Sequence, residues 1–309
     1  MAHRFLVVLS QVCTLFLIMG AGFLFGKLKL ITEKGLKELS SLLINCVCPC
    51  VIVDAFQVDW DTALLVRLGV GFSLLAGAYA VAIGISALFF RRQPEDLRPC
   101  LQYGAMYGNV GFVGLPLVSA VLGEDTVIYA VLAIVVFDLF AFTHGVMRMG
   151  GRGAFSPRQI IRTPALWAVA IGLVLLLTRF RLPGPIYNAV GFISDMNTPL
   201  AMIVIGAQLS RANLLELFRT PILYAASAIK LLLLPVLTAV LLLPLRLDPT
   251  LYTAVVILTG TPSAGFTSIF AQAYHRDATR AAQLVSLSTL LSALTLPLTA
   301  VLAETLCAI

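Results

Sequence analysis

The chain has 309 residues, of which 60% are hydrophobic and only 12% are charged, and its mean hydropathy is +0.98. This composition excludes a disordered, collagen-like, coiled-coil or disulfide-rich protein, and a soluble domain of this length could not bury so much apolar surface. The net charge of +6 indicates loops that face anionic lipid, since no basic tract with interleaved aromatic residues suggests nucleic acid. The sequence therefore predicts an all-α membrane protein.

Ten apolar segments follow one another along the chain, and each predicts a membrane-spanning helix because an open sheet edge is not stable in lipid. The segments cover residues 5–26, 36–56, 64–90, 100–121, 126–147, 164–180, 185–209, 221–245, 250–273 and 281–304. The first is interpreted as a span and not as a signal peptide, because no small-residue cleavage site follows its long apolar run.

The most polar connector, residues 148–163, divides the ten segments into two groups of five. We expect residues 1–150 to form a first five-helix repeat and residues 164–309 a second, joined by a cytoplasmic linker at 151–163. An odd number of spans in each repeat inverts the second repeat relative to the first.

The loop charges predict the orientation in the inner, or plasma, membrane. Fifteen Lys and Arg residues fall in one set of alternate loops and five in the other. Because basic loops stay on the cytoplasmic side, both termini should be periplasmic or extracellular.

Two segments, 100–121 and 250–273, carry Gly and Pro at their centres, where an intact helix disfavours them. Matched broken helices indicate a transporter site, and each new helix N-terminus offers free N–H groups to an anion. We expect two of the prolines, at 116 and 262, in the first turns of these second halves. The alternative is a pair of kinked helices that pack closely through glycine. The predicted substrate-binding residues in these segments are Asn109, Gly111, Pro116, Thr261, Pro262, Ser263 and Gly265.

Further polar residues interrupt other spans. Asn45 and Asn197 are expected to line the same central cavity, the alternative being hydrogen bonds between helices. Asp138 is a candidate for ion coupling, because desolvation favours a protonated carboxyl, although it could equally cap a broken helix or pair with a polar neighbour. Lys230 is expected to snorkel, to pair with an acid or to contact an anion.

The sequence predicts neither an enzyme nor a cofactor. The C-x-C-P-C run at 46–50 lies in an apolar stretch and is typical of packing more than of a metal or redox site. No P-loop, dinucleotide-binding turn, H-E-x-x-H or G-x-S-x-G motif is present. No metal site is expected.

Three motifs resemble those of the auxin efflux carrier family: N-V-G-F-V-G-L-P-L at 109–117, F-A-Q-A-Y at 270–274 after Pro262, and L-P-L at 296–298. The resemblance covers essentially the whole chain. It implies two inverted five-helix repeats whose broken fourth and ninth helices cross at the site. It also carries the family's site residues onto the sequence at Asn109, Pro116 and Pro262.

The resemblance implies transport of organic anions, and two departures favour a bacterial-type member. Plant members have a Lys where this sequence has Gln272, and the 148–163 loop is too short for their regulatory insert. We therefore expect a secondary transporter that moves a small mono- or dicarboxylate by alternating access.

The main alternative is a sodium- or proton-coupled symporter or antiporter with a bile-acid-symporter-like layout, and a channel also stays open. The expected partners are the organic anion and the lipid bilayer, without nucleic acid, and a homodimer is left open.

Overall fold

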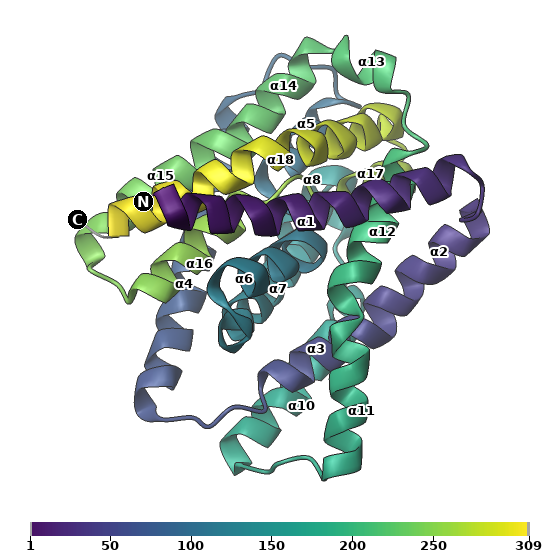
Figure 1. Cartoon of the computed structure of the whole chain (residues 1–309). Helices are drawn as coiled ribbons and strands as arrows, with labels where there is room; N and C mark the ends of the chain where they lie inside the picture. The colour runs from purple at the N-terminus through teal and green to yellow at the C-terminus, as the bar shows by residue number, and fades with distance from the viewer. Residues whose placement is uncertain (1, 308–309) are drawn as a thin grey trace.

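Helices form all the regular elements of residues 2–307, which are the residues that the computed structural model describes (Figure 1). Within this range the one β-type pairing is an isolated antiparallel bridge between Gly108 and Ser263. The helical stretches begin and end within three residues of the apolar segments predicted from the sequence.

The first half of the chain runs from the N-terminus to a short polar connector. Its α-helices are α1 (Ala2–Lys27), α2 (Glu33–Leu42), α3 (Cys48–Ala55), α4 (Thr62–Leu88), α5 (Arg98–Met106), α6 (Leu115–Leu122), α7 (Val127–Phe140) and α8 (Val146–Gly150). Single π-helical turns join α2 to α3 at Leu43–Val47 and α7 to α8 at Ala141–Gly145, and another at Val110–Gly114 directly precedes α6.

The second half begins after the connector, which holds the short helix α9 (Pro157–Ile161). Its α-helices are α10 (Pro164–Thr178), α11 (Gly184–Asp195), α12 (Asn197–Leu209), α13 (Leu214–Phe218), α14 (Pro221–Ala228), α15 (Leu234–Leu242), α16 (Pro249–Thr259), α17 (Phe266–Ala273) and α18 (Ala278–Cys307). A π-helical turn at Ile229–Leu233 joins α14 to α15.

Seven helical stretches in the described residues are long and apolar enough to cross a membrane. They are Leu9–Lys27, Glu33–Ala55, Thr62–Leu88, Glu124–Gly150, Gly184–Leu209, Pro221–Leu245 and Ala278–Cys307. Shorter apolar helices cover Val110–Leu122, Pro164–Thr178 and Pro249–Thr259. Two of these three are short because the chain leaves the helix at 107–109 and again at 260–265.

Helices α1 and α12 pack closely across each other at the front of the molecule (Figure 1). A Cβ atom on Gly206 would lie 1.9 Å from the Met19 carbonyl oxygen, and one on Gly22 would lie 2.3 Å from that of Ile203. Such separations are shorter than any van der Waals contact, so only glycine permits this approach of the two backbones. The contact is the small-residue packing that membrane helices favour.

The buried core surrounds the two breaks, while other helices present apolar side chains outward. Tyr103, Tyr107 and Leu117, from α5, the first break and α6, are fully buried. By contrast, α11 has no buried residue, and Phe192 on it is 74% exposed. Since the exposed side chains are apolar, this surface suits lipid more than water.

Candidate functional site

The two broken helices meet at their breaks and pair through the backbone. The Asn109 N–H donates to the Pro262 carbonyl at 2.7 Å, and the Ala264 N–H donates to the Tyr107 carbonyl at 2.9 Å. These bonds flank the bridge between Gly108 and Ser263. We call residues 107–109 and 261–265 the crossing. The crossing joins segments about 150 residues apart in sequence, so each break satisfies part of the backbone of the other.

Glycine is required at position 108 because the two segments of the crossing approach each other so closely. A Cβ atom there would lie 2.2 Å from the Thr261 Oγ1 atom and 2.9 Å from the Lys230 Nζ atom. The first of these groups is a side chain of the opposite break, and the second comes from the π-helical turn after α14. The sequence motif around Gly108 therefore has a steric explanation in addition to its helix-breaking tendency.

Two hydroxyl groups of the crossing bind carbonyl groups at the ends of the first half-helices. The Thr261 Oγ1 donates to the Leu258 carbonyl and the Ser263 Oγ to that of Gly104, each at 2.8 Å. The Ser263 N–H in turn donates to the Ser288 Oγ on α18 at 3.1 Å. Both Thr261 and Ser263 are 0% exposed. Their hydroxyls thus hold the breaks in place and are not available to a ligand.

Asn109 begins the second half of the first broken helix. Its Oδ1 atom accepts a hydrogen bond from the Phe112 N–H at 3.2 Å, the arrangement of an N-cap. The Nδ2 group of the same amide donates to none of the residues that the structure describes. The half-buried side chain therefore keeps two free donors next to a helix N-terminus.

Both second half-helices also begin with free backbone donors. In residues 2–307 no acceptor pairs with the N–H groups of Gly111, Gly265 and Phe266. Open space adjoins them: a Cβ atom on Gly265 would meet nothing within 4 Å, and one on Gly111 would meet only Ile134, at 3.9 Å. A helix N-terminus with free N–H groups carries about half a positive charge, so the crossing offers two such ends to an anion.

A cavity of about 640 Å³ lies between α1, α3, α6 and the α11–α12 junction. We call it the large cavity. Pro116, Asn197 and Thr198 line it, as do the carboxylate residues Asp54, Glu124, Asp125 and Asp195. Its lining includes no Lys or Arg among the residues that the structure describes. The space is adequate for a small organic molecule, since ligand sites commonly enclose about 300–1,000 Å³.

Asn197 is the buried polar residue of the large cavity. It is 1% exposed, and its Oδ1 atom accepts a weak hydrogen bond from the Cys48 thiol at 3.7 Å. Its Nδ2 group is shielded from solvent and has no partner in the described residues. An unpaired buried donor costs about 1–3 kcal/mol, and a rotation of the side chain toward the cavity would let a ligand or water remove this cost. Asn197, which the sequence predicted as a site residue, therefore lies at the wall of the large cavity.

The structure also places three further residues that the sequence predicted for the site. Asn45 is exposed and donates to the Ser41 carbonyl of its own helix at 2.8 Å, so it does not line the large cavity as expected. Pro116 lies in the first turn of α6, as expected, but a π-helical turn already precedes it. Pro262 lies in the extended part of the crossing, because α17 begins only at Phe266.

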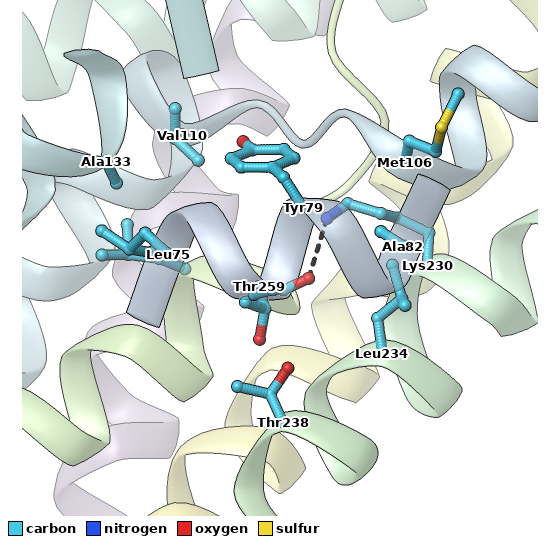
Figure 2. Close-up of a pocket in the computed structure, with 12 residues that line it drawn as sticks. Leu75, Tyr79, Ala82, Met106, Val110, Ala133, Lys230, Leu234, Thr238 and Thr259 are labelled. Carbon is cyan, nitrogen blue, oxygen red and sulfur yellow. Dashed lines mark hydrogen bonds between the residues drawn. The ribbon is translucent and has the colours of Figure 1, made fainter. Parts of the chain in front are cut away.

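The two embedded charges line different pockets. Asp138 lines a cavity of about 100 Å³ between α7 and the start of α10, and no described residue forms an ion pair or a hydrogen bond with its carboxylate. Lys230 is only 2% exposed, and its Nζ atom donates to the Thr259 carbonyl at 2.8 Å (Figure 2). Lys230 therefore neither snorkels nor pairs with a described acid, two of the three expectations for it.

Sequence reasoning did not predict three side-chain contacts at the site. The Cys48 thiol donates to Asn197, the Ser288 Oγ accepts from the Ser263 N–H, and the Tyr107 hydroxyl lies 2.9 Å from the His144 Nδ1 atom. Each acts across two helices that are remote in sequence. Single polar residues in apolar spans are common, so spacing alone could not identify these partners.

Comparisons with known proteins identify the family of the chain. The profile of the family described as "Membrane transport protein" matches residues 7–156 and 152–300. An "Uncharacterized transporter" from Methanothermobacter thermautotrophicus is 24% identical over 288 residues, which cover 90% of this chain and 92% of that protein. A "Putative malonate transporter" from Rhizobium meliloti is 27% identical over 239 residues, covering 73% and 72%. The chain is an integral membrane transporter and belongs to the auxin efflux carrier family.

Proposed function

We propose that the protein is a secondary transporter that carries a small organic anion, a mono- or dicarboxylate, by alternating access. The observation that supports this most is the pair of free helix N-termini at the crossing. The N–H groups of Gly111, Gly265 and Phe266 and the amide of Asn109 all lack acceptors among the described residues. A carboxylate would accept several of these hydrogen bonds and would also interact favourably with both helix dipoles.

The proposal includes ten spans arranged as two inverted repeats, residues 1–150 and 164–309, with residues 151–163 as the linker. The antiparallel bridge between Gly108 and Ser263 supports this arrangement, because equivalent breaks of inverted repeats would approach from opposite directions. The contact of Cys48 with Asn197 adds a second pair, since the two residues lie at nearly equivalent places in the two repeats.

In the proposed orientation both termini and the mouth of the large cavity face the exterior. The loops on the opposite side carry most of the Lys and Arg residues, which favours their cytoplasmic location. An anion would then enter along Asp54 and Glu124 and reach Asn197 and Pro116 deeper in the large cavity. The large cavity would thus be one of the two access routes that an alternating carrier needs.

Malonate is the first substrate to test, because a relative that covers most of this chain is named for it. Its two carboxylates would let one end bind the N-termini of the crossing while the other accepts from Asn197. We include the monocarboxylates as well, because one set of free donors is sufficient to bind a single carboxylate.

Coupling to protons is the second part of the proposal, with Asp138 as the candidate carrier of the proton. The acidic lining of the large cavity favours entry of the substrate together with a proton over entry of the bare dianion. Four carboxylate residues line the cavity and no described Lys or Arg does, so an anion that carries a proton meets less repulsion. Sodium coupling is the alternative, since the same carboxylates would attract a metal cation.

The test is counterflow of labelled malonate in liposomes that contain the purified protein. We expect uptake that saturates and that accelerates when the liposomes are loaded with unlabelled malonate. The Asn213→Asp variant is a matched control, because Asn213 is exposed and lies in a connector outside the predicted spans. Flux that grows linearly with concentration and ignores internal substrate would indicate a channel. Absence of binding to every small carboxylate tested would reject the proposed function.

A further inference from the structure

Lys230 places a buried ammonium group at the end of a broken helix. Its Nζ atom donates to the carbonyl of Thr259, which is the last residue of α16 (Figure 2). The carbonyl end of a helix carries about half a negative charge, so a cation there stabilises it. The side chain reaches this position from the π-helical turn Ile229–Leu233, inside the membrane-spanning stretch 221–245.

The same ammonium group also lies beside the end of the other broken helix. α5 ends at Met106, and a Cβ atom on Gly108 would be 2.9 Å from both Cε and Nζ of Lys230. Met106 and Lys230 line one small pocket together with Val110 and Thr259 (Figure 2). Lys230 therefore binds the carbonyl end of α16 and lies beside the residues that follow α5, while the N–H ends of the second half-helices lie free.

No carboxylate balances this charge in the part of the chain that the structure describes. Lys230 takes part in none of the ion pairs found among residues 2–307. A buried charge without a counter-charge is costly unless dipoles or hydrogen bonds stabilise it. The carbonyl end of α16 supplies such a dipole and a hydrogen bond, which explains why a lysine is tolerated at this depth.

The carbonyl ends of discontinuous helices are also where secondary carriers coordinate sodium ions. At this crossing the position is already taken. The pocket beside Lys230 has a volume of about 20 Å³, little more than one water molecule needs. An inorganic cation would have to displace the ammonium group to reach the Thr259 carbonyl.

We propose that Lys230 is a built-in cation that positions the two broken helices, so that the crossing works without a bound sodium ion. This inference goes beyond the proposed function, because it states that sodium does not bind at the crossing and names Lys230 as the reason. The expected effect of Lys230 on malonate affinity rests on the proposed function, but the expected absence of sodium binding does not.

The first experiment measures thermal unfolding of the purified protein in sodium chloride and in choline chloride at equal ionic strength. The parent should unfold at the same temperature in both salts. Lys230→Ser removes the ammonium group and leaves room for an ion, so it should unfold at a higher temperature in sodium chloride. Leu233→Ser is the matched control, because it places a serine in the same turn at a position that is 40% exposed.

Two results would overturn the inference. Equal sodium-specific stabilisation of the parent and of Lys230→Ser would mean that the ammonium group does not exclude an ion from the crossing. A folded Lys230→Ser protein that responds to sodium no more than Leu233→Ser does would mean that the ammonium group replaces no cation.

If Lys230→Ser does not fold, Lys230→Met decides, since it keeps the chain length without the charge. Lys230→Met should lose about tenfold or more in malonate affinity, and unchanged affinity would contradict the positioning role. Should the parent bind no carboxylate at all, the proposed function fails, whereas the sodium comparison still tests the built-in cation.

Discussion

Asn109 performs two tasks that one substitution can separate. Its Oδ1 atom caps the helix by accepting from the Phe112 N–H at 3.2 Å, while its Nδ2 group is free to donate to a ligand. Asn109→Asp keeps an oxygen for the cap and replaces the donor by a second acceptor. Asn109→Ala removes both. The two variants should therefore differ in stability, and both should lose binding, Asn109→Asp the more because its carboxylate also repels an anion.

The expected sizes follow from these contacts. A hydrogen bond to a charged group contributes about 1.5–3 kcal/mol, so both variants of Asn109 should bind malonate about 10–100 times more weakly. Loss of the cap in Asn109→Ala should lower the free energy of unfolding by about 0.5–2 kcal/mol. Asn109→Asp should stay close to the parent in stability, because its carboxylate lies at a helix N-terminus.

Calorimetry with malonate and thermal unfolding of the same samples measure the two effects. Asn213→Asp provides the control, because it makes the same chemical change at an exposed residue in a connector outside the crossing and the predicted spans. Parent-like affinity in Asn109→Asp would refute the assignment of the free amide to the substrate. Asn197, with its unpaired Nδ2 group in the large cavity, would then become the better candidate.

Three further predictions concern coupling, packing and orientation. Asp138→Asn should abolish malonate uptake driven by a pH gradient without changing malonate affinity; uptake in liposomes that still follows the gradient would assign Asp138 a structural role. Gly206→Ala should lower the unfolding temperature, because its Cβ would lie 1.9 Å from the Met19 carbonyl and overpacking costs about 1–3 kcal/mol; an unchanged temperature would mean that α1 and α12 can separate freely. A cysteine at Gly153, which has open space around it, should react with an impermeant thiol reagent only after the cells are permeabilised; labelling in intact cells would reverse the proposed orientation.

The local properties of the sequence were sufficient to predict the helices and their bounds. Each span is a long apolar run between polar connectors, and lipid leaves helix as its available backbone state, so composition alone determines the element. The positions of the breaks were equally local. Gly and Pro disfavour a helix, and the chain leaves the helix near them at 107–109 and at 260–265, although Pro297 stays inside α18.

The pairing within the site was decided by tertiary structure. Sequence could indicate that Asn109 and Ser263 lie at breaks, but not that Ser263 donates to Gly104 and is closed to a ligand. Asn45 and Asn197 looked equivalent in sequence, yet one is exposed and the other is buried in the large cavity. Their difference depends on the direction in which each helix faces its neighbours.

Lys230 illustrates the physical reason for this division. Its sequence context predicts a costly buried charge but says nothing of what stabilises it. The answer is the Thr259 carbonyl, 29 residues away, which is free only because α16 breaks there. Helix formation depends on neighbours within a few residues along the chain, so it can be predicted from the sequence. Contacts between helices depend on the register of packed backbones, which arises only when the whole chain is assembled.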